Sequence, residues 1–313
     1  MRPEPLPRLN RRMIGALMAR LPDAALSAVA DPRSASYTRW RIGDVLRSVV
    51  VGIAAGCRSL ADTEALTARL SVPVRRALGI VRRLPDTTAR TLLVALDPTE
   101  LRKALNRTII AAIRRKALPL LPGYRFGVVA IDGKVTASRD WDSPFAQRQR
   151  PSSSEPYGLV RTQTCSLISS PGAPCIDAVP IPAETNEDGN LPAVIDHLVD
   201  TFAKTFDLFR LVILDAGTTS KANAEHIRSH SLHYAMRLND NQPTLMQEAL
   251  RVLDGPLAPV PSIHEDSRSS DRVVYQLQLT DELRGFHDWD HLHTVIRVRR
   301  EVYRSDGSRS WRP

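Results

Sequence analysis

The most constraining feature of the sequence is the apolar run at residues 127–131, which leads directly into Asp132 and then a Gly-Lys pair. A short apolar run bounded by turn-forming residues predicts a buried β-strand. The pattern recurs at residues 211–214, which lead into Asp215. Two buried strands that each end in an aspartate predict a metal site, because hard cations such as Mg²⁺ take carboxylate oxygens. For either aspartate alone, a helix N-cap or a turn residue is the simpler interpretation.

Size and composition indicate an ordinary globular protein. At 313 residues the chain suits two domains of roughly 100–200 residues each, and a hydrophobic content of 42% is enough for packed cores. Cys57, Cys165 and Cys175 are too few and too scattered for a disulfide framework or a zinc cluster. The N-terminus lacks a signal-peptide pattern, and no run reaches the ~18 apolar residues of a membrane span. We therefore expect a soluble, cytoplasmic protein with no membrane contact.

Charge is distributed unevenly along the chain. Residues 1–120 contain 22 Lys or Arg against 9 Asp or Glu, whereas residues 121–313 contain 21 against 25. This pattern favours a polyanion-binding N-terminal part followed by a carboxylate-bearing part. Arginine dominates the first part, which suits bidentate contacts with phosphate. The alternative is a general arginine bias that gives a merely solvated basic face.

Periodicity divides the chain into two predicted domains. Amphipathic segments separated by prolines and capping residues predict that residues 1–120 form an all-helical, DNA-binding domain, with helices at residues 11–30, 40–56, after Ser59, and from Asp97 to about residue 117. Residues 121–313 are expected to form an α/β mixed sheet with flanking helices. The expected strands are 127–131, 158–168, 174–181, 211–215, 233–238, 272–279 and 293–303, and the expected helices are 191–206, 220–229 and 243–253. The polar stretch 139–156 is predicted to be a loop.

Several short motifs resemble one family in order and spacing. They are Asp31-Pro32-Arg33, Ala54-Ala55-Gly56-Cys57-Arg58-Ser59-Leu60, Ile131-Asp132-Gly133-Lys134, Thr185-Asn186-Glu187, Leu214-Asp215-Ala216 and Asn241-Gln242-Pro243-Thr244-Leu245. Across residues 31–303 the chain resembles bacterial insertion-sequence DDE transposases of the type that includes the H-repeat-associated proteins. The resemblance implies an RNase H-like core and strand cleavage and transfer in DNA transposition. DNA, at element ends and target, is the implied partner, and a homo-oligomer is a possible assembly.

The resemblance also implies roles for particular residues. In such enzymes two aspartates and a glutamate hold two divalent metals, Mg²⁺ or Mn²⁺, at the scissile phosphate. Carried over, Asp132 is the first carboxylate and Asp215 the second. Lys134 is a candidate phosphate contact, with a surface lysine at a strand end as the alternative. Asn241 and Gln242 are candidates to orient DNA, although capping of the helix that follows is an equal alternative.

The sequence departs from the family pattern most seriously in the third carboxylate. The usual glutamine after the second aspartate is replaced by Ser220, and the usual Lys-Gly before Asn-Gln is Asn239-Asp240. No Ile-Glu-Asn triplet, the family's glutamate context, occurs. Glu187 is a candidate to lie near the site, with a solvated loop acid as the simpler alternative. The later acids of this type are Glu265 and Glu282, in predicted turns, and Glu301, on a predicted exposed strand face. We therefore expect a C-terminally truncated transposase of reduced or no activity. The alternatives are a non-catalytic DNA-binding derivative and, less well supported, an unrelated metal-dependent hydrolase.

Overall fold

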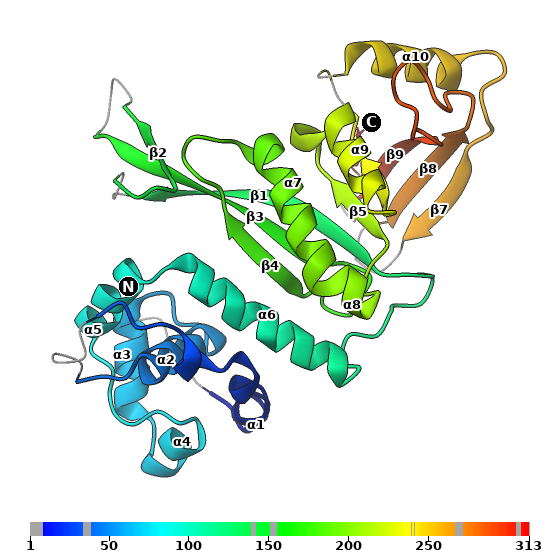
Figure 1. Cartoon of the computed structure of the whole chain (residues 1–313). Coiled ribbons are helices and arrows are strands. Elements are labelled where there is room, and N and C mark those ends of the chain that lie inside the picture. Colours follow the sequence, from blue (N-terminus) through cyan, green and yellow to red (C-terminus); the bar gives the residue numbers. More distant parts are fainter. Residues whose placement is uncertain are drawn as a thin grey trace.

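The computed structural model describes residues 9–33, 39–138, 142–150, 155–238, 240, 242–266, 272–304 and 308–312. Figure 1 shows three parts in chain order. Short helices form the first, a mixed sheet with helices packed on it forms the second, and an antiparallel sheet with a helix beside it forms the third. No helix of the described ranges combines the length and the apolarity needed to cross a bilayer.

The first part is helical, as the sequence predicts. Its helices are α1 (Arg11–Arg20), α2 (Ile42–Ala54), α3 (Leu60–Arg69), α4 (Val72–Ala77), α5 (Asp86–Ala95) and α6 (Pro98–Arg114). Ser59 caps α3 by accepting from the Asp62 amide, and Asp97 caps α6 by accepting from the Thr99 amide. These caps satisfy amides that would otherwise have no partner in the first turn. The single helix predicted over residues 11–30 is wrong, since α1 ends at Arg20 and two 3₁₀ turns follow, the first carrying a proline.

The second part contains a six-stranded mixed sheet. Its strands are β1 (Val128–Ser138), β2 (Ala146–Gln149), β3 (Tyr157–Leu167), β4 (Cys175–Pro180), β5 (Leu211–Leu214) and β6 (His233–Met236). β3 pairs antiparallel with β1, β2 and β4, whereas β5 pairs parallel with β1 and β6 pairs parallel with β5. Without the short β2, the spatial order is β4-β3-β1-β5-β6. Three antiparallel strands followed by two parallel ones in this order form an RNase H-like sheet, which confirms the predicted fold class.

The stretch predicted to be a loop at residues 139–156 contains β2, so that prediction is wrong for Ala146–Gln149. β2 pairs with the first half of β3, from Tyr157 to Val160. Alternation is hard to recognise in its sequence Ala-Gln-Arg-Gln, because only Ala146 is apolar and buried. Residues 139–141 and 151–154 lie outside the described ranges.

Helices cover one face of this sheet. α7 (Glu187–Leu198) continues through a π-helical turn, residues 199–203, into α8 (Lys204–Phe206), and α9 (Lys221–Ser229) follows β5. The apolar core between them contains Val129, Ile131, Cys165, Leu167, Val212 and Leu214 from the strands and Leu191, Val194, Ile195, Leu198 and Phe202 from the helical segment. The predicted helix over 191–206 begins earlier, at Glu187, because the Asn186 side chain caps it by accepting from the Gly189 amide.

The opposite face of the sheet is open over its centre. Side chains alternate along a strand, so Ala130, Asp132 and Lys134 point away from the helix-covered core that holds Val129 and Ile131. Ala130 is half-buried, and Asp132 and Lys134 are exposed. In Figure 1, α7 crosses the front of the sheet. The strand residues that face the other way are therefore accessible to a ligand.

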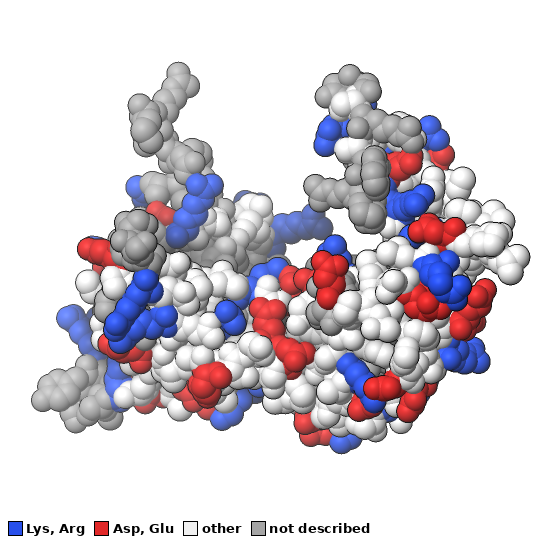
Figure 2. Space-filling view, turned by 90° about the horizontal axis from the view of Figure 1, so that it is seen from above, with Lys and Arg blue, Asp and Glu red and all other residues white. Residues whose placement is uncertain are grey.

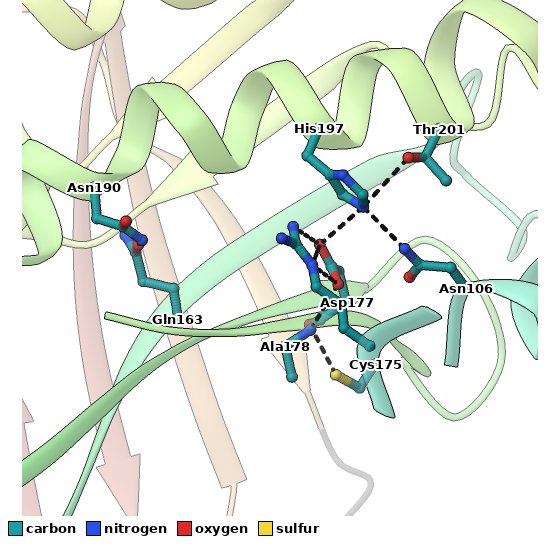
Figure 3. A network of polar contacts seen from close by, with 9 residues as sticks. Asn106, Gln163, Cys175, Asp177, Ala178, Asn190, His197 and Thr201 are labelled. Atoms are coloured by element: carbon teal, nitrogen blue, oxygen red, sulfur yellow. Dashed lines mark hydrogen bonds and ion pairs between the residues drawn. The ribbon is translucent and has the colours of Figure 1, made fainter. Parts of the chain in front are cut away.

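A buried ion pair joins the helical part to this sheet (Figure 3). The Arg102 guanidinium of α6 donates to both carboxylate oxygens of Asp177 in β4, at 2.8 Å from Nε to Oδ1 and 2.5 Å from Nη2 to Oδ2. Asp177 is fully buried, and its Oδ1 also accepts from the Ala178 amide. His197 of α7 lies beside the pair, with Nε2 3.7 Å from Asp177 Oδ2 and 2.9 Å from Asn106 Nδ2. Burial, reinforced by the nearby Arg102 cation, lowers the pKa of His197.

The third part is a separate antiparallel sheet rather than a continuation of the first. Its strands are β7 (Ser262–Asp266), β8 (Arg272–Thr280), β9 (Val295–Tyr303) and β10 (Arg309–Arg312), in the order β10-β9-β8-β7. The preceding helix α10 (Pro243–Asp254) packs through Leu245, Ala249 and Val252 against Leu283. The sequence predicted β8, β9 and α10 but not β7 or β10.

Candidate active site

The structure places Asp132 and Asp215 side by side. β1 and β5 pair in parallel with Ile131 opposite Leu214, so the next residue on each strand is an aspartate. Asp215 has extended dihedrals, φ −76° and ψ 168°, which continue the strand direction. Neighbouring strands lie about 4.8 Å apart, so the two Cα atoms are about 5 Å apart. Both side chains are exposed, and the alternation of the strands directs both to the open face.

This pair of strands is also where the order of the sheet reverses. From β1 the chain builds β3 and β4 on one side and then returns to build β5 and β6 on the other. In open α/β sheets, ligands bind at the carboxyl ends of strands at such a switch point. Asp215 directly follows the carboxyl end of β5 at this point, and Asp132 lies beside it within β1, which continues to Ser138.

Lys134 lies on the same face as Asp132, and its ammonium donates to Asp132 Oδ2 in an exposed ion pair. The Thr164 hydroxyl of the neighbouring strand donates to the Asp132 carbonyl at 3.1 Å. Lys134 thus places a cation in contact with one of the two carboxylates. An exposed pair of this kind contributes about 0–1 kcal/mol, so Lys134 can exchange Asp132 for another anion at low cost.

Asp215 also caps the turn that follows it, which is the simpler role that the sequence suggested for either aspartate alone. Its Oδ1 accepts from the Ala216 amide at 2.7 Å, and it caps the 3₁₀ turn Ala216–Thr218. The Thr219 hydroxyl makes a 2.8 Å hydrogen bond to the Arg237 carbonyl, which ties the loop to the end of β6. These contacts hold the Asp215 backbone in place and leave its side chain at the surface.

The Asn-Gln motif lies close to this loop. Asn241 lies outside the described residues. Gln242 stands at the N-cap position of α10, but its side chain makes no capping hydrogen bond. Its amide instead donates to the Thr219 carbonyl at 3.4 Å. Gln242 therefore contacts the loop that follows Asp215, and the capping alternative is wrong for its side chain.

Glu187 is near the site but on the other side of the sheet. A Cβ built on Gly133 would lie 2.2–2.4 Å from the Glu187 carboxylate atoms, so this carboxylate rests directly against Gly133. Gly133 faces α7, whereas Asp132 faces away from it. The interpretation as a solvated loop acid is wrong, since Glu187 begins α7. Its carboxylate does not share the open face with Asp132.

The later acids belong to the third part of the molecule. Glu265 pairs with Arg272 across β7 and β8, and the Tyr303 hydroxyl donates to Glu301 on β9. Glu265 is on a strand rather than in the predicted turn, whereas Glu282 is in a turn. Among the described residues, the one group of three potential metal ligands whose atoms all lie within 4.8 Å of one another is Asp196, His226 and His230. Asp132 and Asp215 thus provide hard oxygen ligands that suit Mg²⁺, but no third acid completes the set there.

The sequence analysis missed this Asp-His-His group. The signal was present as His226, inside the helix predicted over residues 220–229, and His230, one residue beyond its end. Such spacing places two imidazoles on one face. Asp196 is 30 residues earlier, and only the packing of α7 against α9 brings it to them.

Surface charge is mixed on the face seen in Figure 2. Basic and acidic side chains are interspersed there over the whole breadth of the molecule. Several arginines of the helical part pair with its acids, as Arg33 does with Asp31, Arg83 with Glu64 and Arg115 with Asp23. The exposed side chains of Arg69, Arg76 and Arg90, by contrast, have no ion pair among the described residues.

Comparison with known proteins finds no matching family model and no matching curated protein. Two solved structures show distant likeness. The cryo-EM structure of the piggyBac transposase synaptic complex with hairpin DNA is 16% identical over 85% of this chain, with a TM-score of 0.35. This chain covers 56% of that one. A chain of the simian T-cell lymphotropic virus intasome complex with PP2A regulatory subunit B56 gamma is 9% identical, with a TM-score of 0.22, over 68% of this chain and 88% of that one. At such scores neither likeness assigns an activity.

Proposed function

We propose that this chain is a DNA-processing protein of the DDE transposase class, of the insertion-sequence type that includes the H-repeat-associated proteins. The observation that supports this most is the register of β1 and β5, which aligns Asp132 with Asp215 at the switch point of an RNase H-like sheet. The proposed reaction is cleavage and transfer of phosphodiester strands in DNA, and the proposed compartment is the cytoplasm, where bacterial DNA lies.

In the proposed site, Asp132 and Asp215 are the ligands of a divalent cation. Mg²⁺ or Mn²⁺ bound there would neutralise phosphate charge and lower the pKa of an attacking water or 3′-hydroxyl. Lys134, which contacts Asp132 in the free protein, would turn to a phosphate oxygen when a cation occupies that carboxylate. The Gln242 amide and the neighbouring Asn241 would contact the substrate strand beside the Asp215 loop. The open sheet face leaves room for that strand.

The helical part is the proposed DNA-binding domain, residues 1–120, followed by the core at 121–313. Its free cations include Arg69 at the end of α3 and Arg76 in α4, which are exposed. Contacts with phosphate release counterions, so affinity should fall steeply with salt. Replacing both residues with glutamine should reduce the slope of log K against log salt by about 2, at about 1 for each phosphate contact. The control is Lys204→Gln, since Lys204 pairs with Asp200 outside the helical part.

A second candidate function is DNA binding without catalysis. It is favoured by the carboxylates near the site, because among the described residues no third ligand clusters with Asp132 and Asp215, and Glu187 lies across the sheet from them. Two ligands hold a divalent cation less firmly than three and fix its geometry less well. We therefore expect cleavage by these 313 residues to be slow or absent.

The experiment that tests the proposal is a nicking assay on supercoiled plasmid that carries candidate element ends, with Mg²⁺ or Mn²⁺. The wild-type chain is compared with Asp132→Ala and Asp215→Ala, and with Asp200→Ala as an exposed acid outside the site. Slow cleavage that requires metal and disappears in the first two variants alone supports the transposase proposal. Salt-sensitive binding without cleavage supports the second candidate. Absence of both binding and cleavage rejects both.

A further inference from the structure

We propose a transition-metal site, with Zn²⁺ as its ion, formed by Asp196, His226 and His230 between α7 and α9. His226 lies in the last turn of α9 and His230, four residues later, is its C-cap residue, so the two rings lie at the same end of the helix and both reach Asp196. Asp196 comes from the last turns of α7. The three ligand atoms lie within 4.8 Å of one another. This site is separate from the proposed site at Asp132 and Asp215 and does not depend on it.

Two distances between the ligand atoms come near those of an occupied site. Asp196 Oδ1 lies 2.9 Å from His226 Nε2 and 2.7 Å from His230 Nε2, so one carboxylate oxygen faces both imidazole nitrogens. In a tetrahedral zinc site with bonds of about 2.0–2.1 Å, ligand atoms lie roughly 3.3 Å apart. The side chains therefore need to move outward by only a few tenths of an ångström. The two rings meet edge to face with centroids 5.1 Å apart, so neither blocks the other from the shared point.

The chemistry of the ligands favours a transition metal over Mg²⁺. Imidazole nitrogen suits Zn²⁺ and related ions, whereas Mg²⁺ prefers oxygen ligands in octahedral geometry. Partial burial raises the pKa of Asp196, but hydrogen bonds from His230 and His226 more than offset this and hold the pKa below its usual value. The side chains of Asp196, His226 and His230 are 50%, 30% and 21% exposed, which leaves the fourth position open to water.

A metal at this site would strengthen the attachment of α9 to α7. At its N-terminal end, α9 is already bound to α7 through Asn223, whose amide donates to Asp188 at 2.7 Å and to the Thr218 carbonyl at 3.0 Å. A metal at His226 and His230 would provide a second attachment about one turn further along. Because α9 follows the Asp215 loop directly, two attachments to α7 would fix the direction in which that loop leaves β5.

The test is Zn²⁺ binding to the full chain, measured by competition with a chromophoric chelator, together with Co²⁺ absorption and the thermal midpoint with and without Zn²⁺. We expect one bound Zn²⁺, a higher midpoint with metal, and a Co²⁺ spectrum typical of tetrahedral nitrogen and oxygen ligands. His226→Gln, His230→Gln and Asp196→Asn should each weaken binding at least about a hundredfold, since changes even to residues behind metal ligands cost 10–100-fold. Excess Mg²⁺ should not compete.

Two matched variants complete the design. His264→Gln removes an exposed histidine on β7 and should leave Zn²⁺ affinity unchanged. The double variant Asp132→Asn/Asp215→Asn should also bind Zn²⁺ normally, so failure of the proposed catalytic function would not be confused with failure of this site. Circular dichroism of each metal-free variant checks folding. Three results would each overturn the proposal: no Zn²⁺ binding by the wild type, undiminished affinity in the three ligand variants, or a wild-type Co²⁺ spectrum with thiolate charge-transfer bands.

Discussion

Removal of Arg102 should destabilise the protein strongly, because it leaves a fully buried carboxylate without its charge partner. Asp177 is 0% exposed, and Arg102 provides three of its hydrogen bonds. After Arg102→Met, the Ala178 amide would be the remaining strong donor to that carboxylate. Loss of one partner of a buried pair costs about 3–5 kcal/mol. Since Arg102 keeps 19% of its side chain exposed, we expect a loss near 3 kcal/mol in the free energy of unfolding.

The pH dependence of this loss provides a sharper test through His197. In the wild type, burial and the Arg102 cation lower its pKa, so the unfolded chain binds more protons there and stability falls as the pH drops below about 6.5. Without Arg102, the Asp177 carboxylate favours protonated His197, which replaces part of the lost charge. The destabilisation by Arg102→Met should therefore be smaller near pH ~5.5 than near pH ~8.

Urea unfolding at the two pH values measures both effects, provided that the slope of free energy against urea stays constant. When His197 is already replaced by Gln, the destabilisation caused by Arg102→Met should no longer differ between the two pH values. The matched control is Lys204→Met, which breaks an exposed ion pair with Asp200 and should cost at most about 1 kcal/mol. A loss below 1 kcal/mol for Arg102→Met, or a larger loss in acid than in base, would refute the reasoning.

Three further changes have direct structural expectations. Gly52→Ala places a Cβ 2.4 Å from the Thr63 hydroxyl where α2 crosses α3, so it should destabilise by about 1–3 kcal/mol in urea unfolding, and Thr63→Ala should rescue part of the loss. Asp97→Ala removes the side-chain cap of α6 and should lower the unfolding free energy by about 1 kcal/mol, with Asp97→Asn nearly neutral. Phe202→Ala empties a fully buried position in the main core and should cost about 3–5 kcal/mol, and a thermal midpoint equal to the wild type would contradict this.

The strands and helices that the sequence predicted well are those with strong local signals. Residues 127–131 and 211–214 are short apolar runs, and both are central strands of the sheet. Ser59 and Asp97 are of residue types that commonly cap helices. In the structure Ser59 caps the N-terminus of α3 and Asp97 that of α6. Each aspartate directly follows its apolar run, so the parallel pairing of β1 with β5 brings Asp132 and Asp215 together. The predicted end of the first strand at Asp132 is wrong, since β1 continues to Ser138.

What the sequence did not predict depends on packing between distant segments. The partner of Asp177 is 75 residues away on α6, and no local pattern indicates it. β2 and β7 contain few buried apolar residues, so period-2 alternation is weak in them. The side of the sheet on which Glu187 lies follows from the course of α7, which residue spacing alone does not determine. The Asp196 group likewise depends on how α7 and α9 pack together.

The most direct test of the central claim, that Asp132 and Asp215 hold a divalent cation, is Mn²⁺ binding measured by electron paramagnetic resonance on chain already saturated with Zn²⁺. The account predicts that Mn²⁺ binds, that Mg²⁺ displaces it, and that Asp132→Asn and Asp215→Asn each weaken binding at least about tenfold, whereas Asp200→Asn leaves it unchanged. Equal Mn²⁺ affinity in the wild type and both aspartate variants would contradict the account.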